Sequence, residues 1–217
     1  KIAVSSVKHY DVVVLSDYAK GVLTPQLVRA VIAEARKQKV PVIIDPKRKN
    51  YAAYKGATTI TPNLSELAAA SDSPCDTDER IVKAAKKLIK QCQVEAILVT
   101  RGKDGMKLIT AKGEVEDFQA AAQEVFDVSG AGDTVVACRA TALAADFTLN
   151  DAVYLAALTN GTLAERGSNS LGVSGRILNL TINTNYDAAG AVMLIGGVGT
   201  DEFAVLGNGR FRAVGTE

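Results

Sequence analysis

The chain has no tryptophan, one histidine and three cysteines among its 217 residues. A single histidine, His9, excludes a multi-histidine metal site and any Ser-His-Asp triad that does not use it. It directly precedes an apolar strand, so we interpret it as structural. Cys75, Cys92 and Cys138 are odd in number and lack C-x-x-C spacing, which argues against zinc or dithiol redox chemistry. We expect them to be reduced thiols of a cytosolic protein.

Long hydrophobic runs and an excess of one charge are also missing. No apolar stretch approaches the roughly 20 residues of a membrane span, and the first residues have no signal-peptide pattern. The 25 basic and 24 acidic residues nearly cancel, and no basic stripe is visible along the sequence. We therefore expect a soluble cytoplasmic protein with neither nucleic acid nor membrane as a partner.

The sequence does contain a regular alternation of strand and helix patterns. With 47% hydrophobic residues, the chain is long enough for one sizeable domain. A helix should open at Thr24-Pro25 and others should cover about 77–92, 131–145 and 150–163. Strands are expected at 11–16, 40–44, 58–61 and 96–100, followed by a hairpin of 106–110 and 115–118. This alternation predicts an α/β fold with a mainly parallel, doubly wound sheet.

Polar stretches follow the predicted strands, where ligands bind in open α/β sheets. They are residues 17–21 (Asp-Tyr-Ala-Lys-Gly), 45–47 (Asp-Pro-Lys), 61–66 (Thr-Pro-Asn-Leu-Ser-Glu) and 100–105 (Thr-Arg-Gly-Lys-Asp-Gly). Each has a plain structural alternative. Asn63 and Glu66 fit a helix cap, Gly102 and Gly105 fit a turn, and Asp45 before a proline fits a strand end.

A glycine-rich turn, Asp-Val-Ser-Gly-Ala-Gly-Asp at 127–133, precedes Thr134 and an apolar helical run. Small residues let backbone N–H groups close around an anion at a helix start, with Asp133 facing it. Phosphoryl transfer could use such a site. The alternative is a turn that enters a helix whose first turn carries a favourable acidic residue.

Taken together, these stretches resemble the ribokinase-like carbohydrate kinase family, also called the PfkB family. Residues 127–134 resemble its second signature, with Ser129 where threonine is commoner. Residues 63–66 are similar to its N-x-x-E motif, and residues 100–105 to its T-x-G-x-x-G nucleotide loop. The resemblance covers 1–174, the later half or more of the family's core, and implies a ribokinase-like three-layer fold.

Within this family, residues 15–21, 44–47, 61–66 and 98–101 are similar to the D-glycero-β-D-manno-heptose 7-phosphate kinases. This resemblance implies an ATP-dependent enzyme that phosphorylates the anomeric hydroxyl of the heptose phosphate to give the 1,7-bisphosphate. The product leads to ADP-heptose for lipopolysaccharide. Two alternatives stay open: a family kinase for fructose, a hexose phosphate or a nucleoside, and a non-catalytic nucleotide-binding module.

The family resemblance also implies roles for individual residues. Asp133 would be the general base, and backbone N–H groups of Gly130, Ala131 and Gly132 would form the anion hole. ATP and Mg²⁺ would be the cofactors, with Glu66 acting on the metal through water. The nucleotide-side residues would be Asn63, Glu66, Thr100, Gly102, Gly105 and Asn160. The substrate-side residues would be Asp17, Lys20, Lys47 and Arg101, although solvated surface charge is the alternative for the three cations.

The chain departs from the family pattern at both ends. The usual first strand with its sugar-binding acid, the Gly-Gly motif and most of the β lid do not precede Lys1. Instead, 191–203 resembles a strand and helix start from the family's first half, and 211–217 resembles the edge of a lid, through which family members often dimerise. We assign 175–217 to the same domain as 1–174. Either the order is circularly permuted or pieces of a longer chain are joined; the second is favoured because 175–187 matches nothing coherent.

Overall fold

A seven-stranded sheet forms the centre of the computed structural model, which describes residues 2–118, 131–157, 192–195, 204–206 and 210–212. The strand order is β6-β5-β4-β3-β2-β1-β7. The strands are β1 (Val12–Asp17), β2 (Val42–Pro46), β3 (Thr59–Ile60), β4 (Ala96–Thr100), β5 (Met106–Thr110), β6 (Val115–Phe118) and β7 (Val192–Ile195). Two further strands, β8 (Ala204–Leu206) and β9 (Arg210–Arg212), pair antiparallel in a separate ribbon.

Strands β7, β1, β2, β3 and β4 run parallel, whereas β5 and β6 continue the sheet antiparallel from β4. The parallel part arises because helices connect β1 to β2 and β3 to β4, and such crossovers return the chain in the same direction. The antiparallel part follows from the short turns that join β4 to β5 and β5 to β6.

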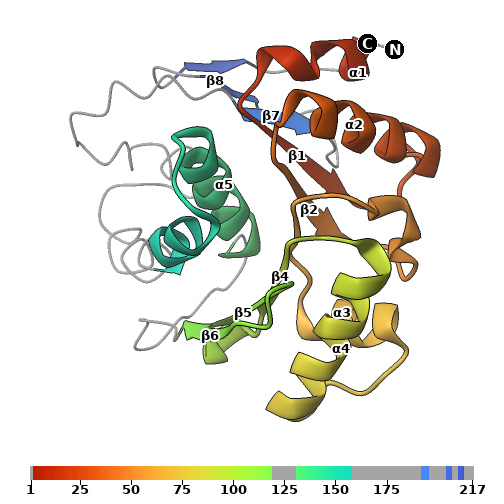
Figure 1. Ribbon diagram of the computed structural model, residues 1–217, viewed down its shortest axis with the longest axis vertical. Helices are drawn as coiled ribbons and strands as arrows, with labels where there is room; N and C mark the ends of the chain where they lie inside the picture. Colours follow the sequence, from red (N-terminus) through yellow and green to blue (C-terminus); the bar gives the residue numbers. More distant parts are fainter. Residues whose placement is uncertain (1, 119–130, 158–191, 196–203, 207–209, 213–217) are drawn as a thin grey trace.

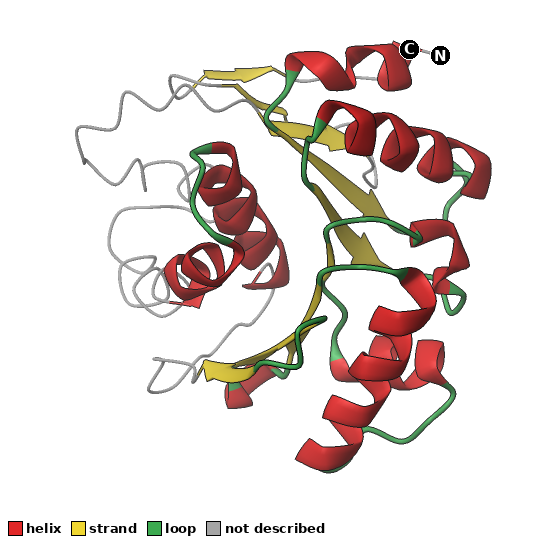
Figure 2. Cartoon of the chain, viewed as in Figure 1, coloured by secondary structure: helices red, strands yellow, loops and turns green. Residues whose placement is uncertain are grey.

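Helices cover both faces of the sheet, which gives three layers (Figures 1 and 2). One face carries α1 (Ile2–Ser6), α2 (Pro25–Gln38), α3 (Leu64–Ser71) and α4 (Asp78–Cys92), with the 3-10 turns η1 (Val7–His9) and η2 (Tyr51–Tyr54). The other face carries α5 (Ala131–Ala144) and the helical residues 149–157. Both faces of the central strands are therefore buried.

The alternation of side chains along β1 serves these two layers. Val13 and Leu15 pack into the core under α2, α3 and α4, while Val12 and Val14 pack against α5. Each strand residue of this group is at most 2% exposed. A continuous apolar run is what a strand covered on both faces requires.

The helices begin and end at residues whose chemistry suits those positions. Thr24 caps α2 and Thr77 caps α4, each accepting a backbone N–H bond three residues ahead. Three helices end in a left-handed residue, at Lys39, Asp72 and Gln93. The Thr24-Pro25 start expected from the sequence is confirmed.

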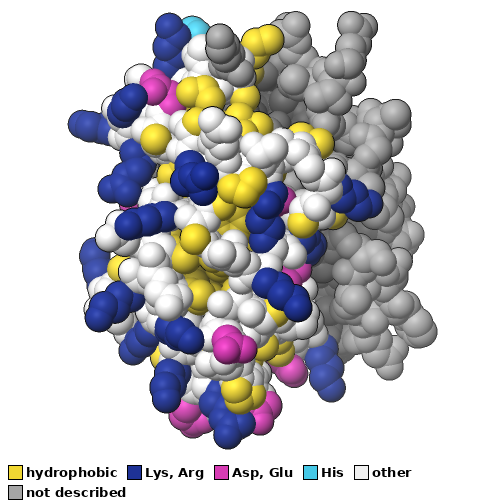
Figure 3. Space-filling view, turned by 90° about the vertical axis from the view of Figure 1, so that its right-hand side faces the viewer, with side chains coloured by type: hydrophobic (Ala, Val, Ile, Leu, Met, Phe, Trp, Pro, Cys, Tyr) yellow, Lys and Arg dark blue, Asp and Glu magenta, His cyan; other side chains and the backbone are white. Residues whose placement is uncertain are grey.

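Amphipathic helices place their cations outward on the α1–α4 face. Figure 3 shows Lys and Arg side chains spread widely over this face, with few acidic ones among them. Exposed examples on α2 and α4 are Arg29, Arg36, Lys37, Lys83, Lys86, Lys87 and Lys90. The near-zero net charge of the chain thus conceals an uneven distribution on the surface.

Most sequence predictions of the elements are confirmed, including the hairpin of β5 and β6 with its bounds. The strand expected at 58–61 is shorter, at Thr59–Ile60. The strand proposed near 193–198 is present as β7, and its residues after 195 lie outside the described residues. The helix expected at 150–163 is seen over 149–157, and its remainder also lies outside them.

All three cysteines are free thiols. In the part of the chain that the structure describes, no helix has the length and apolar character needed to cross a bilayer.

Truncating a side chain in the middle of the sheet should destabilise the whole fold. Ile97 in β4 is fully buried, so Ile97→Ala should lower the free energy of unfolding by about 2–5 kcal/mol. Chemical denaturation followed by circular dichroism would measure it. The matched control is Ile2→Ala, since Ile2 is 83% exposed and its truncation should change stability by less than about 0.5 kcal/mol. Equal effects of the two substitutions would contradict this description of the core.

Candidate active site

The parallel register brings the expected strand-exit residues to one edge of the sheet. Ser16 lies beside Asp45, and Asp17 lies beside Pro46. Beyond the end of β3, Asn63 forms a parallel bridge with Thr100, the last residue of β4, whose N–H donates to the Pro62 carbonyl at 2.9 Å. Four stretches that are separate in the sequence therefore lie along a single edge.

Asn63 and Glu66 form a capping box at the start of α3. The Asn63 side chain accepts the Glu66 N–H at 2.9 Å, and Glu66 Oε2 accepts the Asn63 N–H at 2.9 Å. The structural alternative considered for these residues is thus confirmed. The capping box occupies one oxygen of the Glu66 carboxylate, Oε2. The second oxygen, Oε1, points to Lys47.

Lys47 Nζ donates to Glu66 Oε1 at 2.7 Å, which links the exit of β2 to the start of α3. Burial alone would lower the pKa of Lys47, but the bond to Glu66 and the charge of Asp45 outweigh it and raise the pKa. The lysine side chain is 38% exposed. A ligand arriving at this edge can therefore reach a cation and a carboxylate held together.

Asp45 is a carboxyl group of this edge with a strongly raised pKa. Its Oδ2 accepts the Ser16 hydroxyl at 3.3 Å. Burial raises the pKa of Asp45 to about 6, and the charges of Glu66 and Asp133 add to this effect while Lys47 opposes it. Three carboxylates and one ammonium thus act on one another at this edge.

The start of α5 meets the same edge. Ala131 opens the helix, and Gly132 and the exposed Asp133 lie in its first turn. The charge of Asp133 contributes to the raised pKa of Asp45, so the start of α5 lies within electrostatic range of the strand-exit residues. Gly130, the remaining residue of the predicted anion hole, lies outside the described residues, as does Asn160.

Asp17 is only 1% exposed, and four donors surround its carboxylate. Arg48 donates to both of its oxygens, Tyr54 donates to Oδ2 at 2.8 Å, and the Ala19 N–H donates to Oδ1 at 2.9 Å. Arg48 also donates to the Leu23 carbonyl. These bonds hold the loop that follows β1, so a sugar hydroxyl could reach Asp17 only by replacing one of the donors.

Lys20 sits on that held loop and is exposed. The loop contains two residues of positive φ, Ala19 at 57° and Gly21 at 101°. A left-handed alanine costs about 1 kcal/mol and is kept only when its surroundings demand it. The hydrogen bond from the Ala19 N–H to Asp17 holds Ala19 in this conformation. Lys20 is the next residue of the same loop.

The stretch 100–105 is a tight connection between β4 and β5 containing the 3-10 turn η3 (Gly102–Asp104). Gly102 and Gly105 have φ values of 61° and 76°, which the turn requires. The Arg101 guanidinium donates to Asp117 at 2.9 Å, to Asp78 at 3.3 Å and to the Asp104 carbonyl at 2.9 Å. Its side chain is therefore committed to two carboxylates rather than open to a sugar phosphate.

Three contributors to this edge were not assigned from the sequence. Arg48 and Tyr54 contact Asp17 from 31 and 37 residues away, and no local pattern indicates such a partner. Asp45 belongs to the strand-exit stretch 45–47 that the sequence predicts to lie near a ligand, but no individual role was assigned to it.

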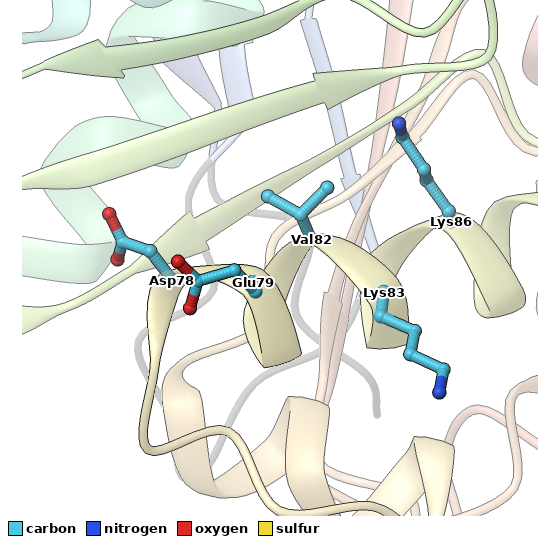
Figure 4. Close-up of a pocket in the computed structure, with 5 residues that line it drawn as sticks. All are labelled: Asp78, Glu79, Val82, Lys83 and Lys86. Atoms are coloured by element: carbon cyan, nitrogen blue, oxygen red, sulfur yellow. The ribbon is translucent and has the colours of Figure 1, made fainter.

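A separate shallow groove runs along α4, lined by Asp78, Glu79, Val82, Lys83 and Lys86 (Figure 4). All five residues come from one helix, and none is a strand-exit residue of β1, β2 or β3. We therefore do not assign the groove to the reaction.

Ionised Asp45 should destabilise the fold above its pKa. A carboxyl whose pKa rises from 3.8 to about 6 on folding favours the folded state when protonated, so this contribution to stability declines as pH rises from about 4 to about 6. Asp45→Asn should therefore raise the free energy of unfolding at pH 7.5, by at most about 3 kcal/mol at 1.36 kcal/mol per pKa unit.

At pH 3.5 the Asp45→Asn variant and the wild type should differ little, because Asp45 is then protonated in the folded state and mostly protonated in the unfolded state. Denaturation curves at the two pH values would measure the difference. Asp104→Asn, at an exposed position, is the control and should shift neither curve. A variant less stable than wild type at pH 7.5 would contradict the proposed cost of Asp45.

Known proteins resemble this chain in both sequence and fold. It is 50% identical over 150 residues to the bifunctional protein HldE of Paramagnetospirillum magneticum, covering 69% of this chain and 31% of that protein. The HldE of Rhodospirillum rubrum is 46% identical over 162 residues, covering 75% and 33%. The chain spans about a third of the length of these curated relatives.

Among solved structures, Arabidopsis thaliana ribokinase complexed with ribose and ATP matches with a TM-score of 0.65 at 23% identity, covering 82% of this chain and 55% of that one. Escherichia coli phosphofructokinase-2 in complex with substrates and products matches with a TM-score of 0.61 at 19% identity, covering 74% and 54%. These likenesses confirm the ribokinase-like fold. The pfkB family carbohydrate kinase model matches residues 1–171, and the chain therefore belongs to that family.

Proposed function

We propose that the protein is an ATP-dependent kinase that phosphorylates the anomeric hydroxyl of D-glycero-D-manno-heptose 7-phosphate in the cytoplasm, where ATP is available. The observation that carries this proposal is the grouping of Asp45 with the Lys47–Glu66 pair at the sheet edge, within electrostatic range of Asp133 at the start of α5. The choice of sugar rests on the stretches similar to heptose 7-phosphate kinases and on the HldE relatives.

The nucleotide side is the edge formed by Asn63, Glu66 and the turn at 102–105. Carboxylate oxygens suit Mg²⁺, which keeps several of its waters, so Glu66 would hold the metal through water while Asn63 orients Glu66. When bound, Mg²⁺ neutralises charge on the ATP phosphates. The raised pKa of Asp45 fits the same picture, because a nearby cation would relieve its repulsion with Glu66.

Asp133 would accept the proton of the sugar hydroxyl as that oxygen attacks the γ-phosphorus. The bond between the γ-phosphorus and the bridging oxygen of ADP breaks as the new P–O bond forms. Backbone N–H groups of Gly130, Ala131 and Gly132, at the positive end of α5, would stabilise the developing negative charge. The role of the protein is thus mainly positioning and charge stabilisation.

Lys20 is the best candidate to bind the 7-phosphate of the sugar. Of the three predicted cations, Lys47 is paired with Glu66 and Arg101 with Asp78 and Asp117. Lys20 is exposed and, within the described residues, has no carboxylate partner at salt-bridge distance. The Asp17–Arg48 bonds hold its loop at the same edge as Asp45.

Turnover should depend on the sugar offered and on Asp133. With Mg-ATP and a panel of heptose 7-phosphate, fructose 6-phosphate, fructose and ribose, ADP release should be strongest with the heptose phosphate. Asp133→Asn should lower kcat by about 100-fold to about 10,000-fold, the usual range of general-base effects, and leave Mg-ATP binding by calorimetry nearly unchanged. Preference for another sugar would overturn the substrate, and retained activity of the variant would remove Asp133 as the base.

Removing the Lys20 ammonium should weaken sugar binding selectively. Lys20→Ala should raise KM for the sugar phosphate by about 10-fold, as expected for one charge-assisted hydrogen bond, with KM for ATP within about twofold. The matched control is Lys112→Ala, an exposed lysine in the turn between β5 and β6. An unchanged KM for the sugar phosphate in Lys20→Ala would exclude this role.

A further inference from the structure

In the described part of the chain, one buried cation has no carboxylate at salt-bridge distance. Arg139, in the middle of α5, is 0% exposed. Its Nη1 donates to the Thr61 hydroxyl at 2.6 Å and its Nη2 to the Thr59 hydroxyl at 2.8 Å. Its Nε finds no hydrogen-bond partner among the residues that the structure describes. Among the described residues no acidic side chain forms a salt bridge with it, so two neutral hydroxyls are the partners of a full charge.

This arrangement is unfavourable for stability. A buried charge without a counter-charge loses its hydration, and replacing buried charged groups with apolar ones is often neutral or stabilising. Burial lowers the pKa of Arg139 to about 9, which still leaves a cation at neutral pH. Packing alone would be served better by methionine or leucine at this position, which suggests that the side chain has another role.

Thr59 lies in β3 and Thr61 directly follows it, in the segment that leads into the nucleotide side of the site. Thr59 and Thr61 lie two residues apart and so face the same side of the sheet. Thr61 is followed by Pro62 and then by Asn63, which caps α3 together with Glu66. Arg139 itself lies six residues after Asp133 on α5. Its hydrogen bonds thus join the helix of the base to the strand of the metal-organising pair.

Other contacts of α5 with the sheet are made by small apolar side chains. Val136, Ala140 and Ala144 pack against β1 and β2, and Val135 packs against β4 and β5. Such contacts are not directional, so they tolerate sliding of a helix over a sheet. Two hydrogen bonds to neighbouring hydroxyls of one strand have directional requirements and restrict that sliding.

We propose that Arg139 is a positioning residue that fixes the start of α5, with Asp133, relative to the exit of β3, with Asn63 and Glu66. The inference rests on the proposed kinase activity. A transferred phosphoryl group must meet both elements at once, and misplacement by about 1 Å can cost about 100-fold in rate. Arg139 touches neither substrate in this role; it acts through the two elements that do.

The test compares Arg139→Met with Val136→Ala in the full-length protein. Both alter the sheet-facing side of α5, but only the first removes the link to β3. For Arg139→Met we expect kcat to fall about 10-fold or more and the Kd of Mg-ATP to rise, with a melting temperature no lower than that of Val136→Ala. Val136→Ala should melt earlier than wild type and keep its kcat within about twofold.

Smaller changes keep the test decisive if Arg139→Met does not fold. Thr61→Val removes one acceptor with little change of shape and should lower kcat in the same direction, and Arg139→Lys should recover part of the activity. In the Arg139→Met and Thr61→Val double variant, the loss of kcat should be smaller than the product of the single losses, because both remove one interaction.

The proposal is overturned if Arg139→Met keeps its kcat and Mg-ATP Kd within about twofold of wild type. It is also overturned if losses of activity in all variants follow their losses of stability. A wild-type protein that binds Mg-ATP but phosphorylates none of the four sugars would refute the proposed function instead. The Mg-ATP Kd values of the variants would then decide the role of Arg139 on their own.

Discussion

Parallel pairing of β1, β2, β3 and β4 is the constraint on which the candidate site depends. Each strand ends at the same edge, so Asp17, Asp45, Asn63 and Thr100 become neighbours although 83 residues separate the first from the last. The helices that return the chain between these strands bury both faces of the sheet. The helices do not cover the edges and strand ends of the sheet, where ligands can bind.

The charges gathered at this edge do not stabilise the fold by themselves. Asp45 has a raised pKa because it is buried near Glu66 and Asp133, while Lys47 and the hydrogen bond from Ser16 oppose this rise. An arrangement that disfavours the folded protein can favour binding of a group with complementary charge. A magnesium nucleotide brings a cation for the carboxylates and anionic oxygens for Lys47 and the start of α5, so both signs would be matched on binding.

Local patterns in the sequence predicted much of the fold. The bounds of β4, β5 and β6 follow from runs of apolar and β-branched residues and from glycine at the turns, and α4 follows from its apolar stripe after Thr77. The strand-exit rule also selected residues that the structure brings together at one edge of the sheet. For Asn63 and Glu66 the two interpretations are compatible: the capping box orients the carboxylate that Lys47 contacts.

The partners of individual side chains could not be predicted in the same way. Asp17 and Arg101 were expected to face the substrate, but Arg48, Tyr54, Asp78 and Asp117 contact them across gaps of 16 to 37 residues. Tertiary folding brings these distant residues into contact, so no spacing pattern in the sequence predicts the contacts. Lys20 differs from Asp17 and Arg101 because the bonds that hold its loop are made by neighbouring residues and not by its own side chain.

Helix α5 is the clearest case in which the surroundings of a side chain could not be predicted from the sequence. Nearly all its residues are small or apolar, so its sequence defines no clear polar side and does not indicate which residues meet the sheet. A rule based on hydropathy would turn Arg139 to solvent, whereas the structure buries it against Thr59 and Thr61. Departures of this kind are expected where a residue is kept for function rather than for stability. We propose that the helix carrying Asp133 is anchored by Arg139, a side chain that a rule based on hydropathy would exclude from its buried face.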